Sequence, residues 1–180
     1  MAETELKRVV IFGTESTGKT TLAKKLAEHF GAPWSPEFVR EFWDLHDGKI
    51  TAIDLGTIAL GQMANEDHAA AQAKRVVFFD TDLLTCTLWD DVLFPGDCPR
   101  WVRAEAELRV RGVTLWLLCD TDIPFAPDPQ RCFPDAAGRE KGRKLWREAL
   151  EKRLLPFVEI RGDQTEREAA AIAAVEKILR

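Results

Sequence analysis

An eight-residue segment, GTESTGKT at positions 13–20, restricts the fold more than any other part of this sequence. It has the pattern G-x-x-x-x-G-K-[ST]. An apolar run at 9–12 precedes it, and Leu22, Ala23 and Leu26 follow it at helical spacing. A strand before the loop and an amphipathic helix after it are the context in which this pattern binds phosphate. The sequence therefore predicts a phosphate-binding loop (P-loop).

The chemistry of this loop predicts a bound nucleotide and a metal ion. Glycines let backbone N–H groups point at phosphate oxygens, and the positive end of the following helix favours the same anion. Lys19 can reach the outer phosphates, and the Thr20 hydroxyl can hold Mg²⁺, which prefers oxygen ligands. The alternative, a glycine-rich turn with a solvated lysine, leaves the flanking strand and helix as coincidence. The residues expected to bind the nucleotide are Gly13, Thr14, Glu15, Ser16, Thr17, Gly18, Lys19, Thr20 and Thr21.

Composition and charge narrow the class of protein. A chain of 180 residues that is 46% hydrophobic predicts a single domain over 1–180 with a sizeable core. The net charge of −5 gives no electrostatic reason to expect nucleic-acid binding. No apolar run approaches the length of a membrane span, and the polar start does not resemble a secretory signal. Four cysteines without a C-x-x-C pair fit reduced thiols. We therefore expect a cytoplasmic protein that acts on a small molecule, with neither nucleic acid nor membrane as a partner.

Strand and helix patterns alternate along the chain. The expected strands lie at 8–12, 76–80, 113–120 and 156–160, with a short extended segment at 32–37. The expected helices lie at 19–30, 38–45, 51–74, 83–89, 101–111, 136–154 and 165–180. Such alternation predicts an α/β fold with a mainly parallel sheet, which together with the P-loop indicates a three-layer α/β/α P-loop NTPase fold. A proline-rich loop at 121–134 predicts a lid region at about 121–145.

Carboxylates follow two of the expected strands. Asp80 and Asp82 come directly after the most apolar strand, where ligands gather in such sheets. Asp80 can reach the Mg²⁺ shell beside Thr20, and Asp82 can point towards an acceptor hydroxyl. The alternative is that both cap the next helix. Asp120 ends the following strand and is the rival carboxylate for the metal.

Phosphoryl transfer also needs a carboxylate that takes or orients the proton of the acceptor. Glu37 is a candidate, because it starts a helix and shares one face with Arg40 and Glu41. The alternative is a solvated, salt-bridged first turn. Trp34, between two prolines, can stack on an aromatic base, although tryptophan is a core residue by default.

The lid region is rich in arginine. Arg131, Arg139 and Arg143 can close over the triphosphate and stabilise the charge that moves. Closure would also exclude water, which a kinase needs in order not to waste ATP. The alternative for each arginine is an ordinary basic helix face.

Several motifs taken together resemble one known family. They are GTESTGKT at 13–20, EFVRE at 37–41, Gly61-Gln62, FDTD at 79–82 with Thr85 and Thr87, and DIPF at 122–125 followed by Asp128 and Arg131. In this order they resemble the ribosylnicotinamide kinase domain of NadR-type proteins. The resemblance implies a P-loop kinase fold and ATP-dependent phosphorylation of nicotinamide riboside on its 5′ hydroxyl, giving nicotinamide mononucleotide.

The resemblance also implies roles for particular residues. Lys19, Glu37, Asp80, Asp82 and Arg131 would be catalytic, Arg131 and Gly162 would join the loop in binding ATP, and Thr20 and Asp80 would hold Mg²⁺. Trp34, Glu37, Arg40, Gln62 and Asp82 would surround the riboside. Asp128 and Arg131 would belong to the lid. Two departures matter: NadR-type proteins carry an adenylyltransferase domain ahead of the kinase, an activity not expected here, and Pro129 stands where the lid pattern has glycine.

Two other functions compete with this one. A kinase for another nucleoside or a nucleoside monophosphate would share the loop, Asp80 and the lid. A nucleotide-dependent regulatory ATPase would hydrolyse nucleotide without an acceptor. The sequence has neither the N-K-x-D guanine motif nor an ABC-type signature, which favours the kinase.

Overall fold

A parallel sheet forms the centre of the molecule. The computed structural model describes residues 5–125, 129–130, 132–133 and 135–180. Within these residues, five strands form one sheet in the order β2-β3-β1-β4-β5, and every neighbouring pair is parallel. The strands are β1 (Lys7–Phe12), β2 (Trp34–Ser35), β3 (Val76–Asp80), β4 (Leu115–Cys119) and β5 (Phe157–Ile160).

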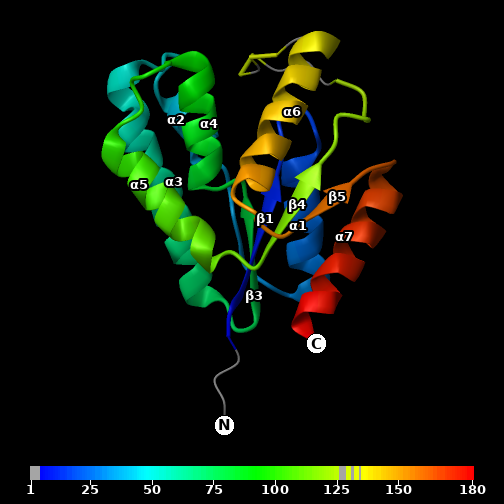
Figure 1. Cartoon of the computed structure of the whole chain (residues 1–180). Coiled ribbons are helices and arrows are strands. Elements are labelled where there is room, and N and C mark those ends of the chain that lie inside the picture. Colours follow the sequence, from blue (N-terminus) through cyan, green and yellow to red (C-terminus); the bar gives the residue numbers. More distant parts are fainter. Residues whose placement is uncertain (1–4, 126–128, 131, 134) are drawn as a thin grey trace.

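Helices cover both faces of the sheet (Figure 1). They are α1 (Lys19–Phe30), α2 (Phe38–Leu45), α3 (Leu55–Gln72), α4 (Leu83–Leu93), α5 (Arg100–Arg109), α6 (Ala136–Lys152) and α7 (Gln164–Leu179). Helices α1 and α7 pack on one face of the sheet, and α3, α4 and α6 pack on the other. Helix α5 packs against α3 and α4. The three-layer α/β/α fold predicted from the sequence is confirmed.

The apolar runs became the central strands because both of their faces are covered. Every residue of β3 and β4 is buried, as expected for parallel strands between two helix layers. Alternate residues of β1 serve the two cores: Val9 and Ile11 face α1 and α7, whereas Val10 and Phe12 face α4 and α6. The predicted extended segment at 32–37 contributes only the two residues of β2, because Pro33 and Pro36 have no N–H to donate to a ladder.

Several element boundaries differ from the prediction, and two of these differences involve 3₁₀ turns. The helix predicted at 51–74 begins with a separate 3₁₀ turn, Ala52–Asp54, because the Thr51 and Asp54 side chains form a capping box there. The strand predicted from position 113 begins at Leu115, because another 3₁₀ turn, Val110–Gly112, follows α5. Neither difference affects where the strands end, so Asp80 and Asp120 still lie at the carboxyl ends of β3 and β4.

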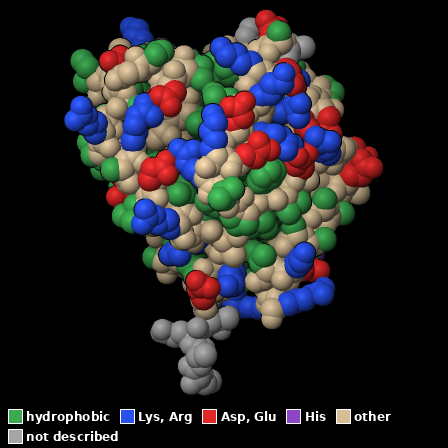
Figure 2. All heavy atoms as spheres, in the orientation of Figure 1, with side chains coloured by type: hydrophobic (Ala, Val, Ile, Leu, Met, Phe, Trp, Pro, Cys, Tyr) green, Lys and Arg blue, Asp and Glu red, His purple; other side chains and the backbone are tan. Residues whose placement is uncertain are grey.

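The surface mixes charges of both signs. On the face shown in Figure 2, Lys and Arg side chains alternate with Asp and Glu side chains, and the upper edge is notched between the α2–α4 side and the α6 side. Among the described residues, no helix is long and apolar enough to cross a membrane. Because all five described strands run in parallel, their carboxyl ends share one edge, where ligands bind in open α/β sheets.

Candidate active site

The predicted P-loop connects β1 to α1 in a tight turn. Gly13 has φ +142°, and a Cβ at this position would lie 2.8 Å from the carbonyl oxygen of Cys119 on β4. Gly18 has φ +77° and sits at the N-cap of α1. Only glycine meets both demands without strain. The pattern of two glycines is therefore explained by the backbone, which curls over the end of the sheet.

Two arginines hold this loop from opposite layers. Arg139 of α6 donates to the carbonyl oxygen of Ser16 at 3.2 Å, and Arg167 of α7 donates to that of Thr17 at 3.0 Å. Both arginines are at least nine-tenths buried. Sequence reasoning gave Arg139 a role over the triphosphate and did not single out Arg167. Both side chains instead bind loop carbonyl groups, which fixes the shape of the loop.

Lys19 and Thr20 occupy the start of α1. Lys19 Nζ donates to the carbonyl oxygen of Thr14 at 2.8 Å, so its ammonium group lies over the loop. Thr20 Oγ1 donates to Asp80 Oδ2 at 2.5 Å. Asp80 is 1% exposed, and within the described residues its Oδ1 has no hydrogen-bond partner. Burial, and next the charge of Glu37, raise the pKa of Asp80 to about 6. A buried carboxylate oxygen without a donor, next to a hydroxyl, fits the oxygen-only preference of Mg²⁺.

Asp120, the rival carboxylate, has other partners. Its Oδ2 lies 2.8 Å from Arg161 Nε, and its Oδ1 lies 3.9 Å from Arg143 Nε. The Thr121 N–H also donates to Oδ1, at 2.6 Å. Arg143 further pairs with Glu140 at 2.7 Å. The geometry therefore places Asp80, and not Asp120, beside Thr20.

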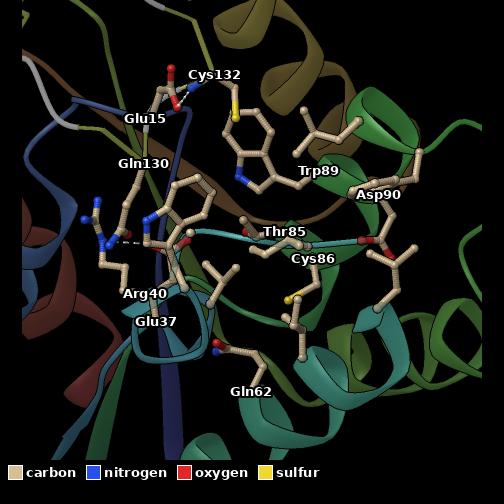
Figure 3. Close-up of a pocket in the computed structure, with 18 of the residues that line it drawn as sticks. Glu15, Glu37, Arg40, Gln62, Thr85, Cys86, Trp89, Asp90, Gln130 and Cys132 are labelled. Atoms are coloured by element: carbon tan, nitrogen blue, oxygen red, sulfur yellow. Dashed lines mark hydrogen bonds and ion pairs between the residues drawn. The ribbon is translucent and has the colours of Figure 1, made fainter. Parts of the chain in front are cut away.

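A cavity of about 350 Å³ opens next to the P-loop (Figure 3). Glu15 and Lys19 of the loop line it together with Glu37 and Arg40 of the α2 start. Arg40 Nε lies 3.3 Å from Glu37 Oε2. The rest of the lining is mainly apolar and comprises Val39, Trp43, Gly48, Ile50, Leu55, Ile58, Gln62, Thr85, Cys86, Trp89, Asp90, Leu93, Phe94, Gln130 and Cys132. One cavity thus brings together the loop lysine and the predicted proton acceptor.

Gln62 lines this cavity and links it to the buried carboxyl group of Glu66. It is 1% exposed, and its Oε1 accepts from the backbone N–H of Phe38 at 3.1 Å. Its Nε2 donates to Glu66 at 3.2 Å. Burial, and next the charge of Asp82, raise the pKa of Glu66 to about 8. Gln62 was predicted as a substrate contact, but its described hydrogen bonds go to the protein.

Comparison with known proteins identifies the family. A family profile described as an AAA domain matches residues 8–167. This chain belongs to that AAA domain family. It is 28% identical to the trifunctional NAD biosynthesis/regulator protein NadR of Salmonella typhimurium over 160 residues, and 28% identical to NadR of Escherichia coli over 159 residues. These matches cover 87% and 86% of this chain, which spans 38% of the length of each relative.

Solved structures share the fold of this AAA domain. A NadR protein in complex with NR has a TM-score of 0.81 at 22% identity, covering 97% of this chain and 51% of the other. A NadR protein in complex with NAD and AMP-PNP has a TM-score of 0.70 at 25% identity, covering 96% and 49%. Thymidylate kinase from Ehrlichia chaffeensis has a TM-score of 0.65 at 13% identity, covering 94% and 98%. The predicted resemblance to NadR-type proteins and to nucleotide-kinase folds is confirmed.

Asp82 of the AAA domain caps a helix. Thr81 has left-handed backbone, φ +68°, and this turn separates the directions of the two aspartates. Asp82 accepts from the N–H of Thr85 at 3.0 Å and from its hydroxyl at 3.1 Å, as the N-cap of α4. Burial raises the pKa of Asp82 to about 6. Its side chain is not part of the cavity lining, so the capping alternative describes Asp82 better than the predicted acceptor role.

Trp34 is also placed away from the cavity. It packs at the edge of the core formed with α1, with Lys24 Nζ 5.5 Å from its ring centroid. Trp43 and Trp89 contribute aromatic lining to the cavity instead. Trp89 could have been found from its spacing, since it lies one helical turn beyond Thr85 on α4. The same reasoning applies to Trp43, which lies three residues beyond Arg40 on α2.

The predicted lid meets the P-loop through Glu15. Glu15 accepts from the backbone N–H of Cys132 at 2.8 Å and from that of Phe133. The ring of Phe133 lies 5.4 Å from that of Trp89. Helix α6 touches the loop as well, because a Cβ at Gly142 would lie 2.4 Å from Thr14 Oγ1. Glu15, predicted to bind the nucleotide, thus anchors the segment around 132–133.

Of the remaining predicted site residues, the structure describes Gly162 but not Arg131 or Asp128. Gly162 follows β5, and its N–H donates to Asp122 Oδ2 at 2.7 Å, while Arg167 links its carbonyl oxygen to the P-loop. Arg131 and Asp128 lie outside the described residues, so their roles stay predictions. Among the described residues, no group of three or more His, Cys, Asp or Glu is arranged to hold a metal by itself.

Proposed function

We propose that this AAA domain is an ATP-dependent small-molecule kinase that phosphorylates nicotinamide riboside on its 5′ hydroxyl. The observation that carries the proposal is that Lys19 of the P-loop and Glu37 line the same cavity. Phosphoryl transfer needs a cation at the moving phosphoryl group and a carboxylate at the acceptor hydroxyl, and little covalent chemistry from the protein. The similarity to NadR protein, solved in one structure with NR and in another with NAD and AMP-PNP, supports the choice of nucleotide and acceptor.

Each residue has a role in this proposal. The P-loop N–H groups bind the triphosphate, and Lys19 stabilises the charge on the phosphoryl group that moves. Glu37 accepts the proton of the acceptor hydroxyl, while Arg40 orients the Glu37 carboxylate through their contact at 3.3 Å. Thr20 and Asp80 would hold Mg²⁺, which neutralises phosphate charge when bound.

The cavity fits an acceptor with an aromatic ring. Its volume of about 350 Å³ lies at the small end of the range for ligand sites. Trp43 and Trp89 line it with flat apolar rings, on which a heteroaromatic ring can stack. Cys132, whose N–H is bound by Glu15, lines the same cavity, and we infer that it helps to keep water from the phosphoryl group.

An ADP-release assay tests the proposal. Mg-ATP is mixed with nicotinamide riboside, the common nucleosides or their monophosphates, beside a blank without acceptor. We expect release that depends on nicotinamide riboside and that Lys19→Ala abolishes. Lys25→Ala, an exposed lysine on the same helix, is the matched control. If another nucleoside stimulates release, that nucleoside is the acceptor and the protein is still a kinase. Steady ADP release without any acceptor would favour the regulatory ATPase.

A further inference from the structure

A buried carboxylate, Asp90, lies at the far end of the acceptor cavity. Asp90 belongs to α4 and is 6% exposed, and it lines the cavity. Figure 3 shows it on the side away from Glu37 and Arg40, beyond Thr85 and Cys86. The carboxylate of Glu37 thus serves one end of the cavity and that of Asp90 the other.

One oxygen of Asp90 lacks a partner. Within the described residues, its Oδ2 is buried and makes no hydrogen bond. Burial raises the pKa of Asp90, while a hydrogen bond with the Cys98 thiol and the charge of Arg103 offset part of the rise. A buried acceptor left without a donor costs about 1–3 kcal/mol. A ligand that brings a donor to this oxygen recovers that free energy.

The geometry of the cavity says which part of the acceptor meets Asp90. The reacting hydroxyl must lie near Lys19 and Glu37, at the P-loop end. Trp89 lies between the two ends (Figure 3), and Trp43 also lines the cavity, so the walls suit an aromatic ring. The substituent on that ring then points towards Asp90. A carboxylate substituent would meet a like charge in a poorly solvated place, which is unfavourable.

We propose that Asp90 is a specificity-determining residue of the acceptor cavity, which accepts a hydrogen bond from an NH₂ group on the acceptor ring and rejects a carboxylate in the same place. This inference rests on the proposed kinase function and adds the chemical class of the ring. Asp90 selects amide- or amine-bearing heteroaromatic ribosides, including those with a cationic ring, over their acid counterparts.

Two substrates that differ in a single group test the inference. Nicotinamide riboside carries a carboxamide where nicotinic acid riboside carries a carboxylate. We expect the wild-type protein to favour the amide in kcat/KM. Asp90→Asn should lower the amide-to-acid ratio by about tenfold or more, since a hydrogen bond to a charged group contributes about 1.5–3 kcal/mol and the Asn amide can donate to the acid.

Asp91→Asn is the matched control. Asp91 is the next residue on α4, but its side chain is about half exposed and pairs with Arg103. We expect this variant to keep the wild-type ratio. Thermal unfolding should show that Asp90→Asn folds at least as stably as wild type, because it removes a buried carboxylate with a raised pKa.

The same experiment separates this inference from the proposed function. Active wild type with an amide-to-acid ratio that Asp90→Asn leaves unchanged overturns the role of Asp90 and leaves the kinase intact. If neither riboside is phosphorylated, the kinase proposal fails, and binding of the two ribosides is measured by quenching of tryptophan fluorescence. If the wild-type protein binds the amide riboside more tightly than the acid riboside and Asp90→Asn removes this difference, the inference is still supported. Equal binding, or none, would overturn it.

Discussion

Gln62 joins the start of α2 to the buried carboxylate of Glu66. The amide of Gln62 donates to Glu66 at 3.2 Å and accepts from the N–H of Phe38 at 3.1 Å. Phe38 is the neighbour of Glu37, so the orientation of this one amide helps to fix the proposed proton acceptor. Arg109, 3.2 Å from Glu66, ends the chain of contacts on α5.

Glu66→Gln should change how stability depends on pH. The pKa of Glu66 is about 8 in the folded protein and 4.5 in an ordinary environment. Between these values the folded state holds a proton that the unfolded state releases, so stability falls as pH rises from about 4.5 to 8. Glu66→Gln removes this loss, and at pH 8 it should be more stable than wild type by on the order of 1 kcal/mol or more.

Denaturant unfolding at pH 5 and at pH 8 measures this effect. Glu105→Gln is the control, because Glu105 also contacts Arg109, at 3.1 Å, but is a third exposed. We expect Glu105→Gln to follow the wild-type pH profile. If Glu66→Gln and wild type lose stability in parallel from pH 5 to pH 8, the pKa of Glu66 is not raised in the folded protein.

Glu37→Gln should lower kcat while leaving ATP affinity nearly unchanged. The glutamine keeps the shape of the side chain but cannot take the acceptor proton, and general-base catalysis contributes roughly 10²–10⁴-fold. Steady-state kinetics and ATP titration measure the two effects separately. Glu41→Gln, on the exposed side of the same helix, should be close to wild type. An equal loss of ATP binding in Glu37→Gln would place Glu37 outside the acceptor site.

Asp80→Asn should weaken Mg²⁺ binding and so raise the Mg²⁺ concentration that gives half-maximal activity. Asp80 accepts from Thr20 at 2.5 Å and has an unpartnered oxygen within the described residues, and even the loss of a residue that only supports a metal ligand typically costs about 10–100-fold in metal affinity. A Mg²⁺ titration of activity at fixed ATP measures the shift in the half-saturating concentration. Asp120→Asn should leave the titration unchanged. The opposite pattern would assign the metal to Asp120.

Glu15→Gln should loosen the lid. The carboxylate accepts two backbone N–H groups, from Cys132 and Phe133, whereas an amide has only one acceptor oxygen and would lose about 1 kcal/mol or more. We expect ADP release without acceptor to rise several-fold relative to transfer, as water gains access. Glu140→Gln, on α6 and paired with Arg143, is the control. Unchanged acceptor-free hydrolysis would mean that Glu15 does not hold the lid closed.

The fold and the P-loop could be predicted from local sequence because their signals are local. Apolar runs at β1, β3 and β4, and two glycines that a tight turn requires, are each contained in a few neighbouring residues. The sheet then places the end of every strand at one edge, which brings Asp80 to Thr20. Spacing and topology were sufficient for this part of the site.

The acceptor cavity could not be predicted in the same way, because its residues meet only through the packing of α2, α3 and α4. The sequence favours Trp34, which lies between two prolines, as the stacking residue, and only packing puts Trp34 against α1 and Trp43 in the cavity. Asp82 has two possible directions after its strand, and the left-handed turn at Thr81 selects the helix cap. Asp90 is an ordinary helical aspartate until its burial is known.

The two arginines that bind the carbonyl groups of Ser16 and Thr17 reach the P-loop from α6 and α7. The contact between Arg167 and Thr17 joins residues 150 positions apart. During synthesis the loop emerges from the ribosome well before α7, the helix that carries Arg167. A growing chain therefore cannot hold its nucleotide site in the final shape until α7 has been translated, and contacts of such long sequence separation are those that form slowly in folding.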